Sequence, residues 1–425
     1  MGTKFPRPKD INFPIVENPI EYKFEKCSEE QGARGKKNSI SLSICELKSG
    51  NILISYFLRD EKNLEMKSFL SIHNVPDLKL LEKYEFESEI NDIIYTVVNA
   101  IQLKNGNIFS ICDKFYFFEG ESIANGPKTT SEEVDSISCK KIDAVFDDPL
   151  DIFQKKTISK DARRYLCDFM IEPKEGIILY TCGLYGDNYE ISLLDISNLE
   201  NLETKGKKVY SYSDLSKQVS YSFDIICLSE YYPENLYVIA NCEETGIHPA
   251  YSRLLIFNSD DFCNKNSSPK KPVNTIEVSG SQNVFALLEY NKTYLLLDTI
   301  NNGIYIINIE TKQKAAVCEL KIIMDHGMTG IEGKLMNYSI NQRNEKVKKD
   351  IFRTLYRKMI KLKDGQVLTV DNSSFFVADI NAQKKVIPSP KNDLYATAKF
   401  VISGNYVIVL QPQDTKLFAY KLYDD

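Results

Sequence analysis

The residues best suited to bind an anion lie in the segment 343–363, which holds nine Lys and Arg residues against Glu345 and Asp350. The net charge of this segment is therefore +7 over 21 residues. Apolar residues recur in it at helical spacing, which predicts a basic amphipathic helix followed by a strand at 356–362. The predicted binding residues are Arg343, Lys346, Lys348, Lys349, Arg353, Arg357 and Lys358.

Two interpretations of this basic segment remain open. A basic amphipathic helix can bind an acidic protein, a nucleic acid or an anionic lipid. Alternatively, its apolar face covers neighbouring strands while the lysines keep the segment soluble. The net charge of the whole chain, -6, lacks the basic footprint of a dedicated nucleic-acid binder, so any basic surface must be local.

Residue types for catalysis are sparse. The chain has three histidines, and none stands at metal-ligand spacing from a Cys, a His or a carboxylate. His73 ends an apolar run, so a capping or surface role is expected for it. His248 lies in a loop, and His326 directly precedes a Gly-rich stretch, 327–333, that lacks the Gly-Lys-Ser/Thr ending of a phosphate loop.

The adjacent carboxylates at 147–148 and 260–261 lie in polar stretches typical of solvated turns. We therefore expect no enzyme, no metal and no cofactor. A minor alternative is a propeller enzyme that uses carboxylates in its central channel.

The ten cysteines show no Cys-x-x-Cys spacing. Cys167 with Cys182, and Cys227 with Cys242, each stand 15 residues apart around a turn. We predict that both pairs are cross-strand neighbours at equivalent positions of two repeats and that they carry free thiols.

The dominant pattern is a hairpin repeat: an apolar strand, a short polar turn that often ends in Gly, and a second apolar strand. The turns Lys48-Ser49-Gly50, Lys104-Asn105-Gly106 and Lys363-Asp364-Gly365 have hairpin chemistry, because Gly accepts positive φ without a Cβ clash. Seven copies are found, three clear ones at 41–57, 97–112 and 357–370 and four weaker ones at 168–182, 224–242, 285–299 and 399–411.

A third apolar strand follows each hairpin, and six of these strands end in a polar residue: His73, Glu119, Asp195, Asn258, Asn308 and Asp379. A fourth, more polar strand comes next, for example at 78–87 and 207–213. Four such strands make one propeller blade, so the sequence predicts an all-β, seven-bladed β-propeller. A β-sandwich, or two smaller β domains, is the alternative that the same strand pattern allows.

The seventh copy stops after its third strand at Asp425. The segment 18–27 resembles the outer strand of the first blade and has no hairpin of its own, so we predict that it closes the ring by joining the last blade. The whole chain, 1–425, is then one domain. Residues 1–37 form its closing strand and lead-in, and residues 120–164 and 321–355 are inter-blade insertions.

The turn at Asp364-Gly365 and the strands that end in Asp195 and Asp379 resemble the WD-repeat propeller family. The resemblance concerns architecture, because the chain has no Trp, hence no Trp-Asp dipeptide, and no Gly-His ahead of its repeats. By analogy with propellers, it implies a non-catalytic scaffold that binds other proteins within a larger assembly. The Trp-free composition, rich in Lys, Asn and Ile, is compatible with a eukaryotic source.

The chain has no apolar run of about 20 residues, the length that crosses a bilayer. Residues 1–10 are polar and lack the apolar core of a signal peptide. We therefore expect a cytoplasmic protein that is not transmembrane.

Overall fold

The turn of the repeat is built in the same way in three places of the computed structural model. The N–H of Gly50 donates to the carbonyl of Leu47, and the N–H of Leu47 donates to the carbonyl of Asn51, both at 2.8 Å. The same pair of hydrogen bonds recurs around Gly106 and Gly365. These are three-residue hairpin loops, and their last residue needs positive φ, which is +81° at Gly50.

The structure describes most of the predicted strands and turns. The described residues are 25–31, 39–59, 66–86, 99–111, 115–130, 165–184, 188–198, 206–211, 215, 221–242, 251–266, 270–280, 284–299, 303–318, 359–371, 374–379, 384–386, 399–411 and 416–422.

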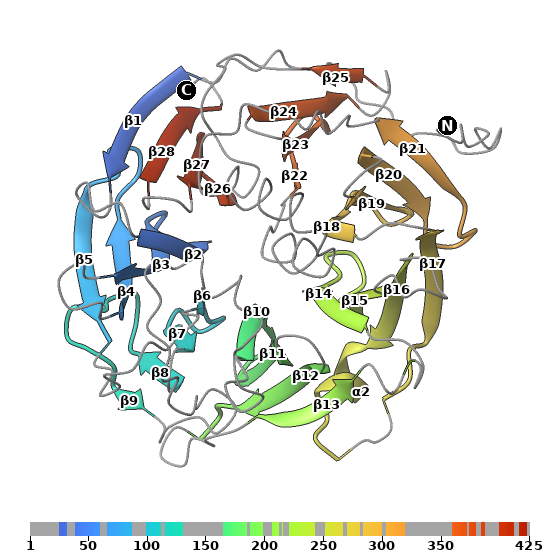
Figure 1. Cartoon of the computed structure of the whole chain (residues 1–425), viewed down its shortest axis with the longest axis horizontal. Coiled ribbons are helices and arrows are strands. Elements are labelled where there is room, and N and C mark those ends of the chain that lie inside the picture. Colours follow the sequence, from blue (N-terminus) through green and yellow to red (C-terminus); the bar gives the residue numbers. More distant parts are fainter. Residues whose placement is uncertain are drawn as a thin grey trace, which may run out of the picture. The chain divides into compact units, whose positions relative to one another are not determined.

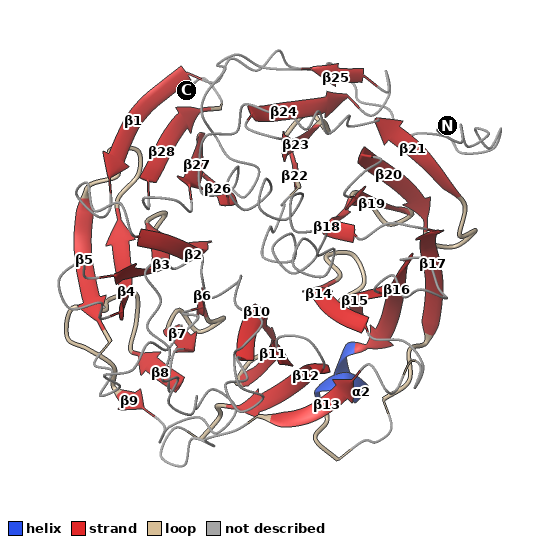
Figure 2. Ribbon diagram, viewed as in Figure 1, coloured by secondary structure: helices blue, strands red, loops and turns tan. Residues whose placement is uncertain are grey.

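The strands of the described residues form seven antiparallel sheets of four strands each. Six sheets consist of consecutive strands, and only one helix, α2 (Ser259–Cys263), is seen in the described residues (Figure 2). The first sheet contains β2 (Ser39–Glu46), β3 (Ile52–Arg59), β4 (Met66–His73) and β5 (Leu80–Glu85). The second contains β6 (Asn99–Gln102), β7 (Ile108–Ile111), β8 (Phe115–Phe118) and β9 (Thr129–Thr130). The third contains β10 (Tyr165–Lys174), β11 (Ile177–Leu184), β12 (Asn188–Asp195) and β13 (Lys207–Ser211).

The next three sheets have the same order. The fourth sheet contains β14 (Tyr221–Leu228), β15 (Asn235–Cys242), β16 (Tyr251–Asn258) and β17 (Asn274–Gly280). The fifth contains β18 (Val284–Glu289), β19 (Tyr294–Thr299), β20 (Gly303–Asn308) and β21 (Lys314–Cys318). The sixth contains β22 (Ile360–Lys361), β23 (Val367–Asp371), β24 (Ser374–Asp379) and β25 (Lys384–Val386). The predicted strand, turn, strand, strand and outer-strand order is confirmed in these six blades.

The remaining sheet is composite. It contains β26 (Lys399–Ser403), β27 (Tyr406–Gln411) and β28 (Lys416–Lys421), and its outer strand is β1 (Glu25–Gln31). β1 pairs antiparallel with β28, from Glu25 opposite Lys421 to Gln31 opposite Lys416. An N-terminal strand therefore completes the last sheet, but it starts seven residues later than the predicted segment 18–27 and overlaps only its end.

The chain divides into two compact units, and the division falls within β13. In the unit that holds residues 25–208 and 399–425, the first strands of successive sheets are neighbours: β26 lies beside β2, β2 beside β6, and β6 beside β10 (Figure 1). In the other unit, β14 lies beside β18, and β21 contacts β25. Sheets that meet through their first strands give each unit a propeller arrangement, so the all-β propeller class is confirmed.

The apolar core lies between neighbouring sheets. One cluster joins the β2–β5 sheet to the β6–β9 sheet, where Tyr116 stands edge-on to Phe86 with 4.7 Å between ring centroids. Equivalent clusters join the β6–β9 sheet to β10–β13, the composite sheet to β2–β5, and the β18–β21 sheet to β22–β25. A single blade cannot cover its own faces, so each depends on its neighbours.

Polar residues in the middle of second strands bind backbone groups of the first strands that have no partner in the ladder. Four first strands carry an irregularity in register, one of them between Cys167 and Met170. Such a bulge leaves a backbone group without a ladder partner. Thr181 lies opposite this bulge, and its Oγ1 accepts the N–H of Phe169 at 2.9 Å. In the first sheet, Ser55 Oγ similarly lies 2.5 Å from Ser43 Oγ, next to the bulge.

The cysteine prediction is half right. Cys167 pairs with Cys182 across β10 and β11, as predicted. Cys227 and Cys242 carry reduced thiols but are not cross-strand neighbours, because Cys227 pairs with Tyr237, and Cys242 with Tyr221. The hairpin of β14 and β15 turns at residues 229–234, so the symmetry point assumed from the spacing of the two cysteines was wrong.

Residues that end the third strands bind the backbone of the loop that follows. Asp195 Oδ1 accepts the N–H of Ser197 at 3.0 Å, and Asn308 Oδ1 accepts those of Glu310 and Thr311. These hydrogen bonds explain why the predicted polar ends recur. Residues 120–130, the start of the predicted insertion 120–164, instead form the β8–β9 loop and β9, while 131–164 and 321–355 lie outside the described residues.

Replacing Thr181 with Val should lower the free energy of unfolding by about 1–3 kcal/mol, because the N–H of Phe169 loses this acceptor in a partly buried site. Thr369→Val is the matched control. Thr369 is also fully buried in a second strand, but in the described part of the chain its Oγ1 has no hydrogen-bond partner. Chemical denaturation should show no loss for Thr369→Val, and equal losses for the two variants would contradict this account.

Candidate functional site

The seven predicted binding residues of the basic segment, from Arg343 to Lys358, lie outside the described residues. The structure does describe the end of that segment. Met359 is buried in the cluster between the β18–β21 and β22–β25 sheets. Lys361 Nζ donates to the carbonyl of Tyr290 at 2.8 Å and lies 4.5 Å from the centre of its ring. Lys361 therefore joins two sheets, and binding by the rest of the segment stays a prediction.

His73 is not a surface residue. It is 1% exposed, its Nε2 lies 3.0 Å from Ser71 Oγ, and its Nδ1 lies 3.0 Å from the carbonyl of Leu78. Since a carbonyl only accepts, Nδ1 carries the proton of that contact. The ring caps the strand by fixing the loop after β4, so the predicted capping role is confirmed. The alternative surface role is wrong, because the β4–β5 loop folds back over the strand end.

Other residues with chemical potential lie in loops. Asp260 and Asp261 form the first turn of α2, and the N-cap residue Asn258 accepts the N–H of Asp261 at 3.0 Å. The predicted turn is thus one short helical turn. His248, His326, the carboxylates at 147–148 and the Gly-rich stretch 327–333 lie outside the described residues.

The structure brings polar residues of neighbouring sheets together at their hairpin turns. We call each such set of hydrogen bonds between two sheets a polar joint. At the first joint, Gln102 Oε1 at the end of β6 accepts the N–H of Lys48 in the β2–β3 turn at 2.7 Å. The side chain of the same residue adds a second bond, because Lys48 Nζ donates to the carbonyl of Lys104 in the β6–β7 turn at 2.6 Å. Lys48 donates both hydrogen bonds, one from its backbone and one from its side chain, so this one residue links the two turns.

The next joint repeats this arrangement one sheet further, with Lys104 as the donor of both bonds. Glu172 of β10 accepts the N–H of Lys104, and Lys104 Nζ donates to the carbonyl of Pro173 at 2.7 Å. Glu172 also accepts the N–H of Gly176 in its own turn at 2.9 Å. In sequence, the joint reads as a polar residue, a buried Leu or Pro, Lys, any residue and Gly, at 102–106 and 172–176.

The β8–β9 loop reinforces the first joint. Glu121 accepts the N–H of Ser49 at 3.1 Å and the side-chain amide of Gln102 at 2.7 Å. Burial alone would raise the pKa of Glu121, but the hydrogen bonds from Ser49 and Gln102 outweigh it and lower the pKa below its ordinary value. Glu82 of β5 holds the same loop by accepting the N–H groups of residues 123 and 124 and the hydroxyl of Ser122.

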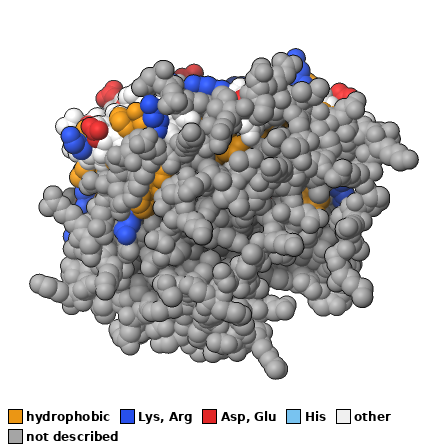
Figure 3. Space-filling view, turned by 90° about the horizontal axis from the view of Figure 1, so that it is seen from above, with side chains coloured by type: hydrophobic (Ala, Val, Ile, Leu, Met, Phe, Trp, Pro, Cys, Tyr) orange, Lys and Arg blue, Asp and Glu red, His pale blue; other side chains and the backbone are white. Residues whose placement is uncertain are grey.

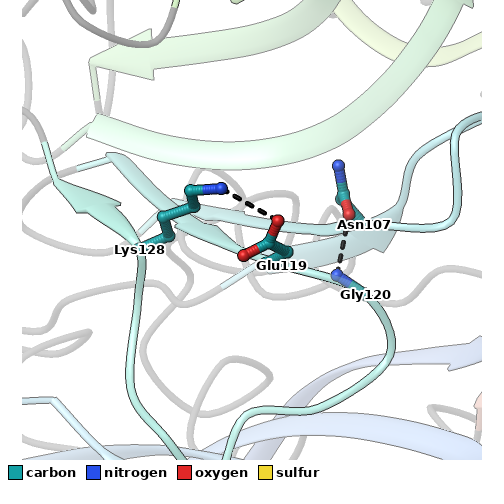
Figure 4. A network of polar contacts seen from close by, with 4 residues as sticks. All are labelled: Asn107, Glu119, Gly120 and Lys128. Carbon is teal, nitrogen blue, oxygen red and sulfur yellow. Dashed lines mark hydrogen bonds and ion pairs between the residues drawn. The ribbon is translucent and has the colours of Figure 1, made fainter.

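Figure 4 shows how both ends of this loop are fixed. Asn107 Oδ1 accepts the N–H of Gly120 at 2.7 Å, and Lys128 Nζ lies 2.8 Å from Glu119 Oε1. Glu119 and Lys128 are both exposed, so their ion pair contributes at most about 1 kcal/mol. The loop is therefore placed mainly by the Glu82, Asn107 and Glu121 contacts.

The most deeply buried joint lies between the β14–β17 and β18–β21 sheets. Glu289, 7% exposed, accepts Ser229 Oγ at 2.6 Å, the N–H of Glu230 at 2.5 Å and Tyr237 OH at 3.0 Å. Burial, together with the nearby carboxylates of Glu289 and Glu230, raises the pKa of the Cys227 thiol to about 12. Burial also raises the pKa of Tyr237.

Asn241 links the same two sheets by hydrogen bonds at the other end of β18. Its Nδ2 donates to the carbonyl of Val284 at 2.9 Å, and its Oδ1 accepts the N–H of Val284 at 3.0 Å. The buried amide thus takes the place of a ladder residue between sheets that share no ladder. Both ends of β18 are therefore held by side chains of the preceding sheet.

The acceptor atoms of these joints are occupied by donors of the chain itself, so the joints serve architecture. Among the described residues, no cluster of three or more His, Cys, Asp or Glu could hold a metal ion. None of the helices in the described part is long and apolar enough to cross a membrane. Sequence reasoning missed the joints, although the polar residue four positions before Gly106 and Gly176 was a visible signal.

No protein-family model matches the chain, and no curated protein sequence matches it. Among solved structures, the chain is similar to BamB from Moraxella catarrhalis, with a TM-score of 0.43 and 9% identity over 95% of this chain and 98% of that chain. This similarity concerns the course of the backbone alone.

Replacing Glu289 with Gln should lower the free energy of unfolding by about 2–3 kcal/mol, because a charged acceptor of several buried donors becomes a neutral amide whose NH₂ faces donors. Glu175→Gln, at an exposed turn, removes the same charge and should change stability by less than about 0.5 kcal/mol. Urea denaturation at neutral pH measures both. A loss that is equal in the two variants would assign it to net charge instead of the joint.

The Cys227 thiol should resist alkylation in the native protein at pH 8, because a pKa of about 12 leaves almost no thiolate. Mass spectrometry after timed iodoacetamide treatment, with and without denaturant, measures the labelling of this residue. Native labelling of Cys227 as fast as in denaturant would contradict the buried joint.

Proposed function

We propose that this protein is a non-catalytic scaffold on which other proteins assemble, and that the composite sheet of β1 and β26–β28 is the seventh blade of a closed ring. The pairing of β1 with β28 supports the ring, because it occupies an edge that would otherwise be open for association. Ser403 Oγ of β26 also donates to the carbonyl of Gly50, in the turn of the first blade, at 2.8 Å.

The observation that supports the scaffold function best is that the polar groups brought together by the fold bind the chain itself. The carboxylates and amides that the fold brings together, such as Glu289, Glu172 and Asn241, bind turns and strands of the adjacent sheet. A framework whose polar groups fix its own joints holds its surface loops in constant positions. Surface loops on a rigid scaffold are where recognition is usually placed.

The turn tips provide such a surface. Lys48, Ser49, Lys104, Asn105 and Glu175 are exposed, while the backbone beneath them is fixed by the joints. Lys and Arg side chains lie beside Asp and Glu side chains on the described surface in the view of Figure 3. Mixed charge of this kind suits the polar rim of a protein interface.

The scaffold proposal predicts that the tagged protein, at its natural level, elutes from a sizing column in native extract well above the volume of a monomer. Ser49→Arg with Glu175→Arg, which adds bulk and charge to the turn tips, should shift it toward the monomer. Thr275→Arg with Glu310→Arg alters exposed residues away from those tips and serves as the control. A monomeric wild-type protein in the extract would overturn the scaffold proposal.

A further inference from the structure

An aromatic and cationic cluster lies at the end of the β14–β17 sheet away from its β14–β15 turn. Tyr221, Cys242 and Tyr251 stand in one cross-strand row of β14, β15 and β16. Arg253 lies two residues further along β16, so its side chain leaves the same face of the sheet. The three large side chains of the cluster therefore come from two strands that are not sequence neighbours.

The two tyrosines hold each other and frame the arginine. Tyr221 OH is hydrogen-bonded to Tyr251 OH, and the rings meet edge-on, with 5.9 Å between centroids. The guanidinium carbon of Arg253 lies 5.2 Å from the centre of the Tyr251 ring and 5.8 Å from that of Tyr221. Tyr221 is 1% exposed, so the cluster is anchored in the core, whereas Arg253 and Tyr251 are half-buried.

The N–H donors of the guanidinium find no acceptor among the described residues. Within the described residues, Arg253 makes only these ring contacts, with no hydrogen bond and no ion pair. Glu277 faces it across β16 and β17, but this exposed carboxylate is not within ion-pair distance. The guanidinium carries five N–H donors in a rigid plane, and none of them binds an acceptor in the described part of the chain.

The chemistry of this cluster selects its ligand. A planar guanidinium fork matches the two oxygens of a carboxylate. One partly exposed ion pair contributes only about 0–1 kcal/mol, which is too little to hold a free small anion. The carboxylate must therefore belong to a larger ligand with further contacts, and Tyr and Arg are the residues that most often dominate such protein interfaces.

We propose that Arg253, framed by Tyr221 and Tyr251, is the anchor point for an acidic segment of a partner protein. A carboxylate of that segment accepts two N–H bonds from the guanidinium, and the remainder of the segment contacts the Tyr251 ring. This inference rests on the scaffold function and names the chemistry of its partner. Glu277 competes for the same cation, so it moderates the affinity.

Selection of a randomised peptide library on the immobilised full chain tests this proposal. Peptides retained by wild-type protein should be enriched in Asp and Glu, and that enrichment should vanish on Arg253→Gln. Lys292→Gln is the matched control, because it removes one exposed positive charge from a turn elsewhere. The proposal is overturned if acidic residues are not enriched, or if both variants lose the enrichment equally.

Fluorescence anisotropy with one selected peptide then tests the geometry. Arg253→Gln should weaken binding by about two- to fivefold, and Arg253→Lys should weaken it too, since Lys keeps the charge but loses the fork. Glu277→Gln should strengthen binding. Full rescue by Arg253→Lys, or no effect of either Arg253 variant, would overturn the bidentate anchor. Thermal unfolding of each variant, expected within a few degrees of wild type, excludes loss of fold.

The two proposals fail in different ways. If the protein elutes as a large assembly from native extract but selects no acidic peptides, the Arg253 anchor is wrong and the scaffold function stands. If the wild-type protein elutes as a monomer, the scaffold function is wrong, and this anchor falls with it.

Discussion

The structure depends on the contact between the end of one sheet's first strand and the hairpin turn of the sheet before it. Each four-stranded sheet has two apolar faces and cannot cover either one alone, so neighbouring sheets must meet in a fixed register. Apolar packing draws them together but is not directional. The hydrogen bonds of Gln102, Glu172, Glu289 and Lys361 to the adjacent turn are directional and therefore fix the register between the sheets.

These joints differ in how deeply they are buried, and that changes what they contribute. Lys48 and Lys104 are exposed, so their bonds to neighbouring carbonyls contribute modestly and are open to competition from water. Glu289 lies where water is largely excluded, so each donor it binds would be costly to leave unsatisfied. With Asn241 at the other end of β18, the β14–β17 and β18–β21 sheets are clasped twice.

The local parts of this fold were predictable, and the parts that depend on neighbouring sheets were not. Hairpin loops such as 47–51 follow from short-range rules, because only Gly accepts the last turn position without strain. The pairing of Cys227 was missed because a longer turn moved the axis of symmetry of its hairpin. The capping role of His73 was predictable from its place at a strand end, but its burial was not, because nothing local indicates that the loop after it folds back to its ring.

The joint residues were visible in the sequence as a recurring polar position before the turn, but their partners belong to another repeat. A pattern within one repeat cannot reveal a contact whose two halves are separated by 54 residues, as Lys48 and Gln102 are. The start of β1 has the same difficulty, since its register is decided by pairing with β28 at the opposite end of the chain.

A polar group that serves the structure differs from one that can bind a partner in whether its donors and acceptors are already occupied. Glu289 has its acceptors occupied by at least three groups of the preceding sheet, so a ligand would have to displace bonds that hold the fold together. Arg253 is held by ring contacts, which fix the guanidinium in place yet use none of its N–H groups. A charged group that is rigidly placed and still has its donors available can bind a partner without weakening the scaffold that carries it.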